Sequence, residues 1–123
     1  MGLDLQLLPV EADRGSWGFS HTVLNWGSGY EVQEWIKDKP LTDPPDNFST
    51  FLAYLPSGDP GYGKTTETPY GEPLRCIRVK YLLQSIPAGQ MDVWLARRET
   101  MKCAILAFLQ QLDPEMKVAL FWH

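Results

Sequence analysis

The chain has 123 residues, of which 44% are hydrophobic and 21% charged, a composition typical of one globular domain. Its net charge of −4 argues against a basic nucleic-acid groove and is too small for a nucleic-acid mimic, so we expect no nucleic-acid partner. No apolar run is long enough to cross a membrane, and Asp4 interrupts the apolar start where a signal peptide needs its hydrophobic stretch. We therefore expect a cytoplasmic protein without a membrane partner.

Two strands are expected at the N-terminal end. Leucine alternates with polar residues over residues 2–8, which predicts a half-buried strand that ends at Pro9. Residues 19–26 (FSHTVLNW) predict a second strand. Consecutive strands are usually neighbours, so an antiparallel pair is the simplest topology.

The next stretch contains two segments with helical spacing and one without regular spacing. Ser28 and Glu31 match the capping-box pattern, which predicts a short helix over residues 30–39. The apolar residues of 48–55 fit a helix or a short buried strand, and we favour the helix. Residues 56–73 hold four glycines and four prolines, which predicts a long irregular loop. So long a loop in a compact domain is usually functional or disordered.

The C-terminal half contains three shorter predicted elements. Residues 74–77 predict an extended piece, and 79–86 fit a two-turn helix that Pro87 stops. The final segment, 116–123, is apolar on both alternating faces. Such a segment is typical of a strand inside a sheet that is covered on both sides.

One long helix is expected from Asp92 to Leu112. Asp92 can accept hydrogen bonds from the first turn, and Pro114 prevents the helix from continuing. The apolar stripe follows the spacing of an amphipathic helix. It comprises Trp94, Met101, Ile105, Phe108, Leu109 and Leu112. A helix of this length measures about 31 Å, so its stripe needs a broad partner such as the face of a sheet.

Together these elements predict a single α+β domain over residues 1–123. A small, mainly antiparallel sheet would contain the N-terminal strand pair and the C-terminal strand. The long helix 92–112 would pack on one face of that sheet, and short helices would cover its edges.

Residues 58–65 match the phosphate-loop pattern G-x-x-x-x-G-K-[ST]. A true phosphate loop needs Lys64 to open a helix, because the helix N-terminus supplies donors and a dipole. Pro69 and Pro73 prevent such a helix, and Pro60 removes one of the loop's N–H donors. We therefore interpret the segment as a glycine-rich surface loop and expect no nucleotide cofactor.

Two histidines form the main catalytic alternative. His21 lies between apolar neighbours in the predicted second strand, and His123 is the last residue of the chain. If their strands are neighbours, Asp4 or Glu72 could complete a site of two histidines and one carboxylate for a divalent metal. Glu67 and Glu72 are a second possible acid–base pair, although a solvated turn explains them better.

The two cysteines, Cys76 and Cys103, lack metal-ligand spacing and lie in apolar segments. A free cysteine in such a segment behaves as a small hydrophobic residue. We expect reduced thiols, in keeping with a cytoplasmic setting, and no metal cofactor.

Aromatic residues indicate protein binding instead. The chain has five tryptophans: Trp17, Trp26, Trp35, Trp94 and Trp122. So small a core does not have room for all of them at its centre, and aromatic side chains near a surface favour a protein-binding patch. Tyr62 and Tyr70 in the 56–73 segment mildly favour a loop that packs or binds.

Four short pieces of sequence resemble known proteins: GLDLQLLPV, FSHTVL, TPYGEPL and VALFWH. They are similar to segments of small uncharacterised proteins encoded by tailed bacteriophages and prophages. The resemblance implies a setting, the cytoplasm of an infected bacterium, and does not imply a reaction. It also draws attention to residues within the matching pieces, namely His21, Tyr70, Gly71, Glu72, Trp122 and His123.

These observations favour a non-enzymatic phage accessory protein that binds a host or phage protein. The binding candidates are Tyr62, Tyr70, Gly71, Glu72 and Trp122. The alternative is a small metal-dependent hydrolase or nuclease that uses His21, with His123 and a carboxylate such as Glu72.

Overall fold

A four-stranded antiparallel sheet forms the centre of the computed structural model, which describes residues 3–10, 23–44, 50–54, 60–65, 68 and 72–123. The strand order is β2-β1-β6-β5. The strands are β1 (Asp4–Pro9), β2 (Leu24–Ser28), β5 (Arg75–Arg78) and β6 (Lys117–Trp122). As expected, the N-terminal strand pair and the C-terminal strand belong to one sheet, in which β1 lies between β2 and β6. The second strand, predicted over residues 19–26, lies instead at Leu24–Ser28, and residues 19–22 lie outside the described part of the chain.

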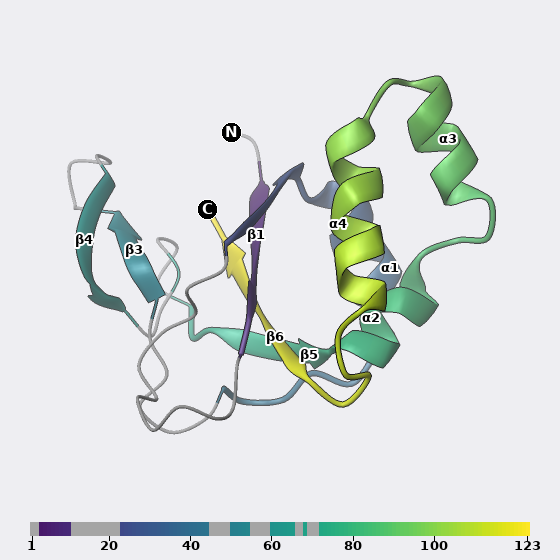
Figure 1. Ribbon diagram of the computed structural model, residues 1–123. Coiled ribbons are helices and arrows are strands. Elements are labelled where there is room, and N and C mark those ends of the chain that lie inside the picture. The colour runs from purple at the N-terminus through teal and green to yellow at the C-terminus, as the bar shows by residue number, and fades with distance from the viewer. Residues whose placement is uncertain (1–2, 11–22, 45–49, 55–59, 66–67, 69–71) are drawn as a thin grey trace.

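The described helices lie on one side of this sheet (Figure 1). They are α1 (Tyr30–Ile36), α2 (Val79–Ser85), α3 (Gln90–Ala96) and α4 (Thr100–Gln110). The predicted class, a single α+β domain, is confirmed. The short helices predicted over 30–39 and 79–86 are present, each slightly shorter than expected.

A separate hairpin lies on the other side of the sheet (Figure 1). Its strands are β3 (Thr50–Tyr54) and β4 (Pro60–Thr65), paired antiparallel. The helix predicted over 48–55 is therefore wrong, and part of the segment predicted as an irregular loop is strand β4. Aromatic and β-branched residues such as Thr50 and Phe51 favour strands, and in so short a run pairing with β4 overrides helical spacing.

The sheet is buried on both faces. Toward the helices, Leu5 and Leu7 of β1 pack in one apolar cluster with Val118 and Leu120 of β6. On the opposite face, a second cluster comprises Leu8, Val10, Leu74, Cys76, Ala119 and Phe121. The prediction for the final strand is confirmed, but β1 is not half-buried, because even Gln6 is enclosed.

The predicted helix 92–112 is two helices, α3 and α4. The chain turns at Arg98, which has a positive φ of 60°. Two hydrogen bonds close the end of α3, from Arg98 N to Leu95 O (3.1 Å) and from Glu99 N to Trp94 O (2.8 Å). This is the bond pattern of a helix that ends in a left-handed residue, a position usually taken by glycine.

The break changes which residues of the predicted stripe are buried. In α4, Ile105, Leu106 and Leu109 face the core. Met101 and Phe108 were predicted to be buried, but they are 69% and 40% exposed. Because α3 and α4 are separate helices, the buried face of α4 does not have to line up with Trp94. This face therefore does not include Met101 and Phe108.

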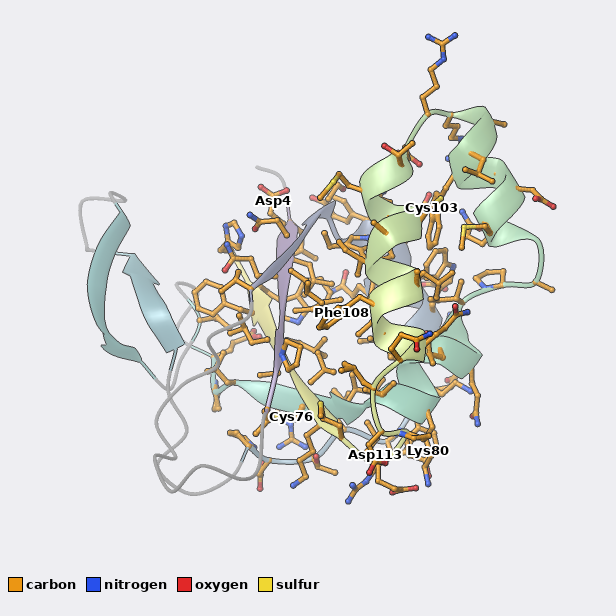
Figure 2. All side chains as sticks on the ribbon, viewed as in Figure 1. Asp4, Cys76, Lys80, Cys103, Phe108 and Asp113 are labelled. Atoms are coloured by element: carbon orange, nitrogen blue, oxygen red, sulfur yellow. The ribbon has the colours of Figure 1, made fainter. Side chains whose placement is uncertain are left out.

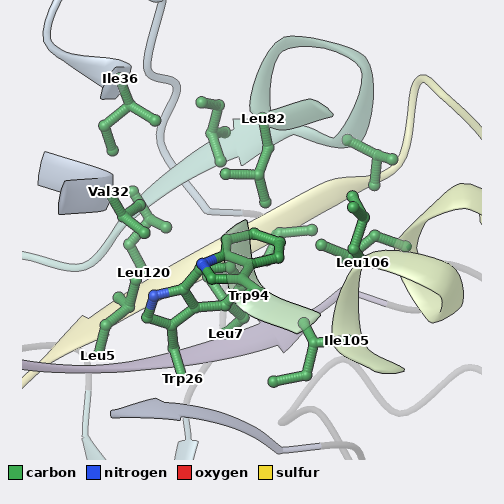
Figure 3. Packing of buried hydrophobic residues seen from close by; sticks show 14 residues of the cluster. Leu5, Leu7, Trp26, Val32, Ile36, Leu82, Trp94, Ile105, Leu106 and Leu120 are labelled. Atoms are coloured by element: carbon green, nitrogen blue, oxygen red, sulfur yellow. The ribbon is translucent and has the colours of Figure 1, made fainter. Parts of the chain in front are cut away.

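The described tryptophans lie in or against the hydrophobic core and not on the protein surface. Trp26 and Trp94 are buried with ring centroids 5.3 Å apart in an edge-to-face arrangement (Figure 3). The ring centroid of Trp35 lies 6.3 Å from that of Trp94. Trp122 is partly buried against the same cluster, and Trp17 lies outside the described residues. Among the described tryptophans, the expected surface surplus is therefore absent.

Helix α1 begins differently from the predicted capping box. Ser28 belongs to β2, and the N-cap is Gly29, without a side-chain cap bond. A Cβ on Gly29 would lie 2.5 Å from Cζ3 of Trp122 and 2.9 Å from Cβ of Leu5. Glycine is required here because the backbone passes directly over the Trp122 ring.

Candidate functional site

A hollow of about 290 Å³ lies between α1, the last strand and the segment that leads into β5. Three stretches of chain that are distant in sequence form its wall. The lining residues are Gln33, Ile36, Lys37, Leu41, Thr68, Glu72, Pro73, Arg75, Leu120 and Trp122. We call this feature the α1 hollow.

The floor of the α1 hollow is apolar and firmly packed. Ile36 of α1 and Leu120 of β6 are buried members of the main core cluster. Trp122 is fixed beside them, because the close approach of Gly29 leaves its ring little room to move. The floor therefore exists before any ligand arrives.

Polar side chains surround this floor. Gln33 of α1 and Lys37, the residue just after this helix, are one helical turn apart, and Glu72 and Arg75 line the hollow from the stretch that enters β5. The Lys37 ammonium donates a hydrogen bond to the Glu34 carboxylate, which raises the pKa of Lys37 above its usual value. The rim thus carries two cations (Lys37 and Arg75), the carboxylate of Glu72 and the side-chain amide of Gln33 around an apolar floor.

Long-range contacts hold the outer wall in place. Arg75 donates to Asp43, with 2.7 Å between Nη1 and Oδ1, and also to Leu41 O at 3.3 Å. The backbones of Thr42 and Cys76 exchange two hydrogen bonds of 2.8 Å each. Residues 41–43 are thereby held against the edge of β5, which places Leu41 at the hollow.

Two of the binding candidates predicted from the sequence meet at this hollow, Glu72 and Trp122. Glu72 O also accepts a hydrogen bond from Thr68 N at 2.8 Å. Tyr62 belongs to β4, where it is opposite Leu52. Tyr70 and Gly71 lie outside the described residues.

Sequence reasoning missed most of the wall. Only the spacing of Gln33, Ile36 and Lys37 would have indicated that these residues share one face of a helix. No local sequence pattern places Leu41 and Arg75 together. The β-bridge between Thr42 and Cys76, which are distant in sequence, brings them to the same wall.

The described strand register leaves the histidine alternative untested. His123 pairs with Asp4 through two backbone hydrogen bonds of 2.9 Å, at one end of β1. The second strand begins with Leu24 opposite Leu7, three residues and about 10 Å further along β1. His21 precedes Leu24 and lies outside the described residues, among which no group of three metal-ligating side chains occurs.

The glycine-rich match at 58–65 does not have the geometry of a phosphate loop in its described part. Pro60–Thr65 is strand β4, and Thr65 pairs with Thr50 of β3. Lys64 therefore lies within a strand rather than at the start of a helix, as the sequence argument against nucleotide binding requires.

Neither cysteine forms a disulfide bond. Cys76 is fully buried, and its burial raises the pKa of the thiol to about 11. A thiol with so high a pKa is almost entirely protonated at neutral pH, so Cys76 packs as a small apolar side chain.

Neither a protein-family model nor a curated protein nor a solved structure matches this chain. Within the described ranges, no helix is both long and apolar enough to cross a membrane.

Proposed function

We propose that this chain is a non-enzymatic protein-binding module, and that the α1 hollow receives one anchor side chain of its partner. The setting implied by the sequence resemblance is the bacterial cytoplasm during phage infection, with a host or phage protein as the partner. The observation that carries the proposal is the hollow itself, with its rigid apolar floor and its polar rim.

The size of the hollow favours an anchor side chain over a cofactor. Small-molecule sites usually measure roughly 300 to 1,000 Å³, and this hollow lies at the lower limit with about 290 Å³. A single large side chain fills a space of this kind, and such anchors contribute most of the affinity at protein interfaces.

The chemistry of the hollow supports the same conclusion. Ile36, Leu120 and Trp122 offer a water-excluding base for an aromatic or aliphatic group. Lys37, Glu72 and Arg75 surround it with charges that can pair with the partner's backbone and polar side chains. Pre-formed floors of this type lower the entropic cost of binding, since little has to be ordered on association.

The test is to change the wall without disturbing the core. Leu41 lines the hollow and is 37% exposed, so Leu41→Arg introduces a long charged side chain at the mouth. The matched control is Leu95→Arg on α3, where Leu95 is 53% exposed and does not line the hollow. Tagged versions of the full chain are used for pull-down from bacterial and from phage-infected lysates.

We expect the original chain and Leu95→Arg to retain the same stoichiometric protein, and Leu41→Arg to lose it. Equal capture by both variants would show that the hollow is not the binding site. Failure to capture any protein from either lysate would count against the binding function as a whole.

A further inference from the structure

Helix α4 presents an uncharged outer face. Thr100–Gln110 contains one charged residue, Lys102, and its ammonium lies over the ring of Trp26, 5.7 Å from the centroid. The Lys102 side chain is only 17% exposed and contacts Glu99, with 3.5 Å between Nζ and Oε1. The side of α4 that faces away from the core therefore carries no charge.

Apolar side chains follow this outer face at helical spacing. Met101, Ala104 and Phe108 are all exposed, and they fall at i, i+3 and i+7 on one side of the helix. Exposed helical faces in monomers usually carry charged residues, and the depletion of charge is a compositional mark of an interface core. We call Met101, Ala104 and Phe108 the α4 stripe.

The α4 stripe is complementary to itself in an antiparallel arrangement. Met101 and Phe108 are seven residues, or about 10.5 Å, apart along the helix. A two-fold axis midway between them places Met101 of one copy against Phe108 of the other. Ala104 lies next to that axis, where a small side chain allows two helices to approach closely.

The charges beyond the two ends of α4 fit the same arrangement. Arg98 lies two residues before the start of α4 at Thr100, and Asp113, labelled in Figure 2, lies three residues beyond its end at Gln110. In an antiparallel pair, Arg98 of one copy comes to the helix end of the other copy, where Asp113 and the negative end of the helix dipole attract a cation. A parallel pair would bring like charges together instead.

We propose that the α4 stripe binds the α4 stripe of a second copy of this chain, as an antiparallel two-fold pair. This inference does not depend on the α1 hollow, because none of these residues lines it. The contact surface of one helix of 11 residues is small, so the dimer is weak and forms at micromolar or higher concentrations.

Sedimentation equilibrium of the full chain, from about 1 µM to about 1 mM, measures this association. We expect a monomer–dimer equilibrium for the original sequence. Met101→Lys introduces a buried charge opposite Phe108 and weakens dimerisation by about tenfold or more. The matched control is Leu95→Lys, which adds the same charge at an exposed apolar position of α3, outside the stripe, and leaves the equilibrium unchanged.

A charge exchange tests the antiparallel orientation. Arg98→Asp and Asp113→Arg should each weaken the dimer, and the double variant Arg98→Asp/Asp113→Arg should restore it. Rescue supports contact between copies, since the two positions lie at opposite ends of α4 within one chain. A monomer at all concentrations, a dimer insensitive to Met101→Lys, or no rescue in the double variant would each overturn the proposal.

Discussion

Trp94 and Trp122 belong to the same apolar cluster but have different surroundings. Trp94 is 0% exposed and is enclosed by Trp26, Trp35 and α4. Trp122 packs against Gly29 on one side and lines the α1 hollow on another. Composition alone therefore does not assign a role to a tryptophan: Trp94 is placed to stabilise the fold, whereas Trp122 remains available to a ligand.

Removing the enclosed ring should have the largest effect. We expect Trp94→Ala to lower the free energy of unfolding by about 3–5 kcal/mol, since it leaves a cavity inside a packed core. Trp122→Ala should cost clearly less, because part of its ring already faces the hollow. Urea unfolding followed by far-UV circular dichroism measures both values. Equal losses would show that the two tryptophans are not distinguished by their surroundings.

Trp94→Phe separates the loss of ring volume from the loss of the indole N–H. The indole nitrogens of Trp26 and Trp94 are buried and have no hydrogen-bond partner among the described residues. An unpaired buried donor is unfavourable, so Trp94→Phe removes that cost while it keeps most of the ring volume. It should therefore be much less destabilising than Trp94→Ala.

Gly29 limits the space around the Trp122 ring. Gly29→Ala places a Cβ about 2.5 Å from Cζ3 of Trp122, so the ring or the start of α1 has to move. We expect a loss of about 1–3 kcal/mol, as for other overpacked sites. Because Trp122 forms the floor of the hollow, partner capture should fall with it.

Gly27→Ala is the control for this experiment. Gly27 has a positive φ of 88°, but the space around it is open. An alanine there strains the backbone by about 1–2 kcal/mol without touching Trp122. If capture falls equally in both variants, lost stability rather than the displaced ring explains it.

Much of the fold follows from periodicity in the sequence. The last strand is apolar on both faces, and it is central in the sheet. The segments 30–39 and 79–86 have apolar residues at helical spacing, and both form helices. These segments were predictable because local pattern and tertiary packing favour the same structure.

The errors arise where packing decides between two local solutions. Residues 50–54 fit a helix or a strand, and pairing with β4 decides for the strand. The sequence has neither glycine nor proline at the break near Arg98, so no local pattern predicts it. The break accompanies the burial of Trp94 in α3 and of Ile105, Leu106 and Leu109 in α4. The α1 hollow depends on the Thr42–Cys76 bridge, a contact between distant residues that no local pattern predicts.

A substitution at Arg98, in the turn between α3 and α4, should change the stability least. Arg98 adopts a φ of 60°, which costs a residue with a Cβ about 1–2 kcal/mol. Arg98→Gly removes this strain, although glycine also gains freedom in the unfolded chain, so we expect a net stabilisation of about 0.5–1 kcal/mol. Thermal unfolding at sub-micromolar concentration, below the range of the proposed dimer, measures the change.

The same substitution separates the two consequences of having arginine at this position. If Arg98 serves dimer formation through its charge, Arg98→Gly stabilises the monomer and at the same time weakens association. Arg98→Lys is the appropriate comparison, because lysine keeps the positive charge and, like arginine, has a Cβ that is strained in the left-handed conformation. Destabilisation by glycine would contradict the left-handed turn, and the two helices would then have to be joined in another way.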